Sequence, residues 1–193
     1  MPGQSDVDPL VPRAGVANVA NVLTGLRIVL VPVFLAALFV GDGHESHWRI
    51  VAFVIFAAAV VTDRVDGAVA RGYDMVTEFG KLADPIADKA LIGAALIGLS
   101  LLGDLPWWVT VVILVREIGV TVLRFAVIRG GVIPASRGGK LKTLVQAVAI
   151  GLFVLPLTGP WLTAAWAFMW AAIVLTVLTG VDYVVSAIRG ARG

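Results

Sequence analysis

Two pairs of aspartates lie between residues 63 and 88. Asp63 and Asp66 are three residues apart, and Asp84 and Asp88 are four apart, so each pair occupies one face of a helix. A turn between two antiparallel helices would place the pairs opposite each other. Four converging carboxylates repel one another, and burial adds to the cost, so they need protonation or cations to neutralise them.

Divalent cations suit this arrangement because an all-oxygen ligand set favours hard ions such as Mg²⁺ or Mn²⁺. Two such ions about 3.5–4 Å apart would hold a phosphoryl group for in-line displacement. The small residues Gly67 and Ala70 leave space beside the carboxylates, and Arg71 adds a forked cation. The alternative is structural, with the aspartates capping helices and pairing with nearby basic residues: Arg64, Arg71, Lys81 and Lys89.

The elements that position these groups are apolar helices. The chain has 193 residues, 59% of them hydrophobic, and its mean hydropathy is +0.95. A bilayer core needs about 20 mostly apolar residues per helix. We therefore predict an all-α integral membrane protein with six transmembrane helices in one domain, residues 18–193. Residues 1–17 are expected to form a tail or juxtamembrane segment, with a short interfacial helix from about Pro12. The expected spans are 19–41, 49–71, 86–103, 106–128, 141–158 and 161–187.

The placement of Lys and Arg predicts the orientation of these spans. Basic residues gather in both tails and in the connections after the second and fourth spans, whereas the other connections hold only Arg49 together with acidic residues. Both termini and the aspartates should therefore face the cytoplasm. The chain has no cysteine, which excludes disulfides and thiolate chemistry.

The aspartate segment resembles a family signature. It reads DxxDGxxAR from Asp63 and then, after eight residues, GxxxDxxxD from Gly80. This pattern resembles that of the CDP-alcohol phosphotransferases. The resemblance implies a six-helix membrane enzyme, usually a homodimer, that binds two divalent metals. Such enzymes transfer the phosphoryl-linked group of a CDP-linked lipid or alcohol to an alcohol and release CMP.

The resemblance also implies roles for individual residues. The four aspartates, Asp63, Asp66, Asp84 and Asp88, correspond to the metal ligands, and Asp88 also to the general base. Three stretches outside the signature are similar to bacterial phosphatidylglycerophosphate synthases: NVLTGLRIVLVP (21–32), VREIGVTVLR (115–124) and GGKLKTLVQ (138–146). The expected CDP-lipid contacts are Asn21, Thr24, Arg27, Asp66, Gly67, Ala70, Arg71 and Gly80.

The expected acceptor carries a phosphate. Arg116, Glu117 and Arg124 lie inside the fourth span, where charged groups are costly and are candidates for function. Glu117 and Arg124 are seven residues apart, on one side of that helix, and a structural Arg–Glu pair is the alternative. We expect Arg116, Arg124, Arg137 and Lys140 to bind the phosphate.

These features predict transfer of the phosphatidyl group from CDP-diacylglycerol to sn-glycerol 3-phosphate in a bacterial plasma membrane. Membrane lipids are expected partners and nucleic acid is not. A phosphatidylinositol phosphate synthase that uses inositol 1-phosphate would need the same cations, and a cardiolipin synthase of the superfamily is a further alternative. A cation transporter is an alternative of another class, because carboxylates within membranes also mark transport sites. Transporter sites, however, usually lie near the midplane on broken helices.

Overall fold

The computed structural model describes residues 14–70, 78–127 and 137–190, with side chains over 25–62, 89–123 and 139–186. Over these ranges the chain is helical and contains no strand. A short 3₁₀ helix, η1 (Val40–Gly43), follows the first α-helix. The α-helices are α1 (Ala14–Phe39), α2 (Ser46–Ala70), α3 (Glu78–Leu101), α4 (Trp107–Val127), α5 (Arg137–Val154) and α6 (Pro160–Gly190).

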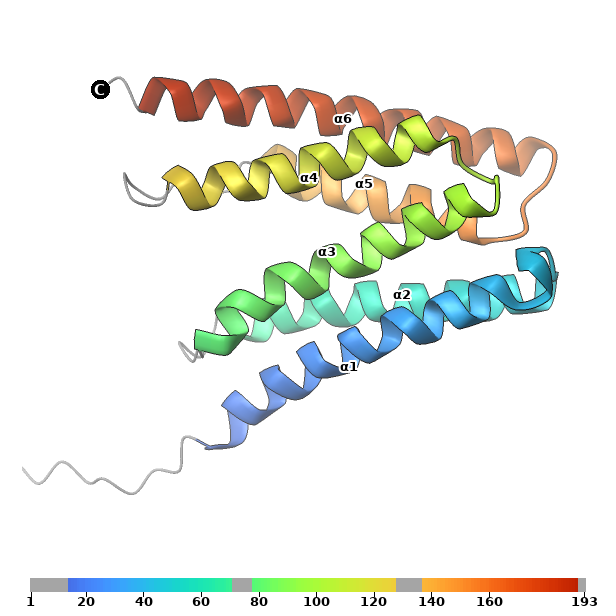
Figure 1. Ribbon diagram of the computed structural model, residues 1–193, viewed down its shortest axis with the longest axis horizontal. Coiled ribbons are helices and arrows are strands. Elements are labelled where there is room, and N and C mark those ends of the chain that lie inside the picture. Colours follow the sequence, from blue (N-terminus) through green and yellow to red (C-terminus); the bar gives the residue numbers. More distant parts are fainter. Residues whose placement is uncertain (1–13, 71–77, 128–136, 191–193) are drawn as a thin grey trace, which may run out of the picture.

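The helices run alternately up and down a single bundle (Figure 1). In Figure 1, α1, α3 and α5 begin at the left end of the bundle, where α2, α4 and α6 end. The most extensive pairings are α5 with α6, α1 with α2, and α1 with α3. Helix α3 also contacts α4 and α5, so it joins the α1–α2 pair to the rest of the bundle.

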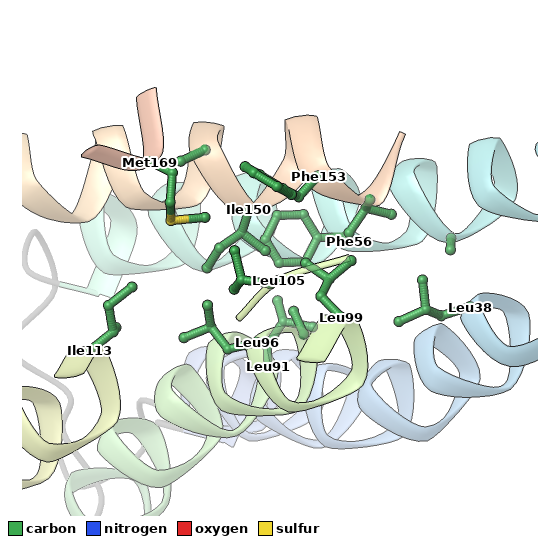
Figure 2. Close-up of a cluster of buried hydrophobic side chains, with 14 of the residues drawn as sticks. Leu38, Phe56, Leu91, Leu96, Leu99, Leu105, Ile113, Ile150, Phe153 and Met169 are labelled. Atoms are coloured by element: carbon green, nitrogen blue, oxygen red, sulfur yellow. The ribbon is translucent and has the colours of Figure 1, made fainter. Parts of the chain in front are cut away.

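A continuous apolar core holds the helices together (Figure 2). Phe34 and Phe56 pack with their ring centroids 5.7 Å apart, and both side chains are buried. Close approach of α1 and α3 depends on Gly98, because a Cβ there would lie 2.9 Å from Cδ2 of Leu38. Lipid tails are as apolar as leucine, so tight packing of this kind stabilises membrane helices more than apolar burial does.

The outward faces of the bundle are also apolar. Val54, Val115, Val122 and Leu178 are among the exposed large side chains. Within the described ranges, two stretches are long and apolar enough to cross a membrane, Gly25–Gly43 and Pro160–Ser186. Shorter apolar stretches occur at Ser46–Thr62 and Lys89–Leu101. An apolar exterior around a packed core is the arrangement expected of a membrane protein.

An ion pair joins two elements at the end of the bundle that lies on the right in Figure 1. The guanidinium of Arg49, in the first turns of α2, donates to Asp104 in the connection between α3 and α4. Arg49 is buried and Asp104 is partly buried. This pair links two elements that are far apart in the sequence, and it lies at the opposite end from the aspartate-bearing helix ends.

The six α-helices follow the six expected hydrophobic segments, but most boundaries differ by a few residues, and the starts of α1 and α3 differ most. Helix α3 begins at Glu78, eight residues before the expected span, because its polar first turns lower the local hydropathy without breaking the helix. Residues from Ala14 onward already belong to α1 rather than to a separate interfacial helix. Residues 1–13 lie outside the described residues, so the rest of the expected tail stays a prediction.

The bundle generates a prediction about orientation, since the helix ends that flank the basic connections share one end. In the natural cysteine-free chain, Thr77→Cys should react with a membrane-impermeant thiol reagent only from the cytoplasmic side. Ser46→Cys, at the start of α2, should react only from the opposite side. Labelling of right-side-out and inverted vesicles measures both. Reversed labelling of the two positions would overturn the orientation derived from Lys and Arg placement.

Candidate active site

The signature aspartates lie on two helices whose ends meet at one end of the bundle. Asp63 and Asp66 belong to the last turns of α2, and Asp84 and Asp88 belong to the first half of α3. The two helices contact each other, and both pack extensively on α1. Gly67 and Ala70 complete α2, and Gly80 lies in the first turn of α3. The side chains of these residues, and Arg71 entirely, lie outside what the structure describes.

The donor set fits divalent ions in its chemistry. Four carboxylates would supply hard oxygen ligands, and spacings of three and four residues in unbroken helices keep each pair on one face. No other group of three or more His, Asp or Glu side chains within metal-binding reach occurs where side chains are described. The aspartate quartet stays a predicted metal site.

Helix α1 supplies the next predicted contacts. Asn21, Thr24 and Arg27 succeed one another at three-residue intervals along it, so they follow one side of the helix. Arg27 is only 5% exposed. A guanidinium is expensive to bury, which makes it a candidate for holding anionic groups in the interior of the bundle. The side chains of Asn21 and Thr24 lie outside the described residues.

The charged residues of α4 form a network with α3 and α5. One oxygen of Glu117, Oε1, accepts from Nζ of Lys142 and from Nη1 of Arg116, the latter at 3.3 Å. The other oxygen, Oε2, accepts from Nζ of Lys89 at 3.4 Å. We call Lys89, Arg116, Glu117 and Lys142 the Glu117 cluster. Charged side chains inside membrane helices usually pair in this way.

The predicted acceptor residues have different surroundings. The side chain of Arg116 is 16% exposed, and it also donates through Nη2 to Thr179 of α6 at 2.8 Å. Lys140 is exposed in the first turns of α5. Arg124 lies in the last turns of α4, and Arg137 is the first residue of α5, at the same end of the bundle as the aspartate-bearing turns. The side chains of Arg124 and Arg137 are not described, so the role of these two residues stays a prediction.

Two lysines of this region were not among the predicted site residues. Lys89 directly follows Asp88, and Lys142 is the second lysine of the GKLKT stretch. Both contact Glu117 from a different helix. The sequence did carry a signal, because an acidic residue inside an apolar span, such as Glu117, needs cationic partners. The spacing within α4, however, suggested Arg124 as the partner of Glu117.

Comparison with known proteins identifies the family. Residues 17–178 match the CDP-alcohol phosphatidyltransferase family. The chain belongs to this family. The match includes all four aspartates and the Glu117 cluster.

Within this family, the chain is similar to three proteins with related names. The chain is 67% identical to a protein named "Probable phosphatidylglycerophosphate synthase" from Mycobacterium tuberculosis, over 98% of this chain and 91% of the relative. It is 36% identical to the CDP-diacylglycerol–glycerol-3-phosphate 3-phosphatidyltransferase of Bacillus subtilis, over 86% of this chain and 93% of the relative. The enzyme of the same name from Salmonella paratyphi A is 33% identical, over 90% and 96% respectively.

The predicted metal site can be tested by substitution. Asp66→Asn and Asp84→Asn each remove one charge while nearly preserving shape. Each should lower kcat/KM on the order of 100-fold or more, because a bound divalent ion contributes several kcal/mol to transition-state stabilisation. CMP release in the presence of Mg²⁺ or Mn²⁺ measures the loss, and Asp42→Asn, at the opposite end of the bundle, is the matched control. Near-normal activity in either variant, or in excess chelator, would contradict the assignment.

Proposed function

We propose that this protein transfers the phosphatidyl group of CDP-diacylglycerol to sn-glycerol 3-phosphate, giving phosphatidylglycerophosphate and CMP. The observation that carries the proposal is 67% identity over nearly the whole chain to a relative named as a phosphatidylglycerophosphate synthase. The two relatives named for this glycerol 3-phosphate reaction, at 36% and 33% identity, support the same acceptor. The bundle adds an apolar exterior suited to a lipid substrate.

The reaction needs one bond made and one broken. A hydroxyl oxygen of glycerol 3-phosphate forms a bond to the phosphorus that carries the diacylglycerol, and the bond from that phosphorus to the oxygen of CMP breaks. The hydroxyl proton passes to a carboxylate, which we assign to Asp88. When bound, divalent ions held by Asp63, Asp66, Asp84 and Asp88 supply charge neutralisation at the diphosphate. Membership of the family implies divalent ions, and we propose two, either Mg²⁺ or Mn²⁺.

The remaining residues bind and orient the substrates. Buried Arg27 of α1, together with Asn21, Thr24, Gly67, Ala70, Arg71 and Gly80, is assigned to the CDP-lipid. The acceptor phosphate is a dianion and needs its own cations, because the diphosphate already uses Arg71 and the metals. The cations that we assign to it lie on α4 and in the first turns of α5: Arg116, Arg124, Arg137 and Lys140.

The same proposal extends to the membrane and the assembly. Six helices would cross a bacterial plasma membrane, with both termini and the site on the cytoplasmic side, where glycerol 3-phosphate is available. The positive-inside distribution of Lys and Arg supports this orientation. A homodimer follows from the family resemblance, and residues 18–193 would constitute its membrane domain.

The acceptor assignment generates a prediction. Arg124→Ala should raise the KM for glycerol 3-phosphate roughly 30- to 150-fold, because loss of a charge-assisted phosphate contact costs about 2–3 kcal/mol. The KM for CDP-diacylglycerol should stay nearly unchanged. Arg124→Lys keeps the charge but loses the forked geometry, so its KM for glycerol 3-phosphate should lie between those of the wild type and Arg124→Ala. CMP release at varied acceptor concentration measures all three proteins.

Two results would contradict this assignment. First, Arg124→Ala could bind CDP-diacylglycerol poorly and keep its KM for the acceptor. Arg124 would then bind the nucleotide or stabilise the helix bundle. A wild-type enzyme that uses inositol 1-phosphate or phosphatidylglycerol far better than glycerol 3-phosphate would replace the proposed acceptor. Absence of CMP release with any acceptor alcohol would favour a non-enzymatic class such as a transporter.

A further inference from the structure

Two members of the Glu117 cluster are buried to an unusual degree for charged side chains. The side chain of Lys142 is 3% exposed and that of Glu117 is 14% exposed. Burying charges costs several kcal/mol each in desolvation, and pairing often does no more than repay this cost. Well-packed apolar residues would serve stability alone equally well. A charged cluster at this place therefore calls for another role.

The two oxygens of Glu117 face different helices. Oε2 accepts from Lys89 of α3, and Oε1 accepts from Lys142 of α5. Arg116 extends the contacts to α6 through Thr179. Gly180 permits this approach, since a Cβ there would lie 3.2 Å from Cγ of Arg116. One carboxylate of α4 therefore fixes the spacing between α3 and α5.

The helices joined in this way carry the reacting parts of the proposed site. Lys89 directly follows Asp88 in α3, and Lys142 lies two residues after Lys140 in α5. Helices α3 and α5 contact each other as well. A shift between them would change the distance from the proposed general base to the cations assigned to the acceptor phosphate.

We propose that Glu117 is a positioning residue for the acceptor. It holds Lys89 and Lys142 so that α3 and the basic start of α5 keep the spacing at which the acceptor hydroxyl meets Asp88. This inference rests on the proposed function, because it concerns the acceptor of that reaction. Glu117 touches no reacting atom in this account and acts through the two lysines.

Glu117→Gln provides the first test. Its amide keeps the size of the side chain, but its NH₂ group must face either Lys89 or Lys142, where a donor meets a donor. The kcat/KM for glycerol 3-phosphate should fall roughly 10- to 100-fold, the effect expected of a misplacement of about 1 Å. The KM for CDP-diacylglycerol should stay within about twofold of wild type.

A double variant separates positioning from stability. Glu117→Gln removes the carboxylate that Lys142 contacts, so its Tm should fall, and adding Lys142→Met removes that buried charge and should restore much of the Tm. Acceptor kcat/KM should nevertheless stay low in the double variant, because the link between α4 and α5 is still missing. Asp104→Asn is the matched control. It breaks the buried ion pair with Arg49 at the other end of the bundle, so it should lower the Tm and leave acceptor kinetics unchanged.

The outcomes are distinct when full-length protein is assayed in lipid nanodiscs by CMP release and thermal unfolding. Acceptor kcat/KM that recovers with the Tm in the double variant would overturn the inference, as would equal losses for both substrates. Unchanged acceptor kinetics in Glu117→Gln would overturn it while leaving the proposed function intact. A wild-type enzyme that does not respond to glycerol 3-phosphate would instead overturn the proposed function.

Discussion

Repulsion among like charges is the constraint on which the proposed site depends. Four aspartates occupy the end of α2 and the beginning of α3, and their carboxylates would raise the cost of ionising one another if they converge as predicted. Divalent cations would relieve that cost and also neutralise a diphosphate, so one arrangement would serve both the protein and its proposed substrate. The packing of α1 against both helices limits how far the two aspartate-bearing segments can separate.

In α3, α4 and α5 the charges that lie close together are positive. Lys89, Arg116 and Lys142 all contact the carboxylate of Glu117, so cations from α3, α4 and α5 meet at one side chain. A dianionic acceptor needs fixed cations near the attacking hydroxyl but separate from the metals. Buried charged contacts supply such rigidity because any misplacement leaves a charge without its partner. The bundle thus combines an apolar exterior with a network of charged side chains between its helices.

Much of this arrangement was predictable from the sequence, for reasons that differ between its parts. The number of helices followed from hydropathy, and the helical placement of Asp63, Asp66, Asp84 and Asp88 followed from their spacing. The start of α3 at Glu78 did not follow, because polar helical turns and polar loops have similar hydropathy. The partners of Glu117 did not follow either. Periodicity relates residues within one helix, whereas Lys89 and Lys142 reach Glu117 from neighbouring helices, and that proximity is a property of the tertiary packing.

The most direct test of the central claim is to count bound divalent ions. Titration of the purified protein with Mn²⁺, followed by electron paramagnetic resonance of the free ion, reports stoichiometry without requiring any activity. In the presence of a CDP-lipid we expect two ions for each chain in the wild type and fewer in Asp84→Asn, because the carboxylates of α2 and α3 hold them together. Equal binding by wild type and Asp84→Asn, or no binding by either, would contradict the account.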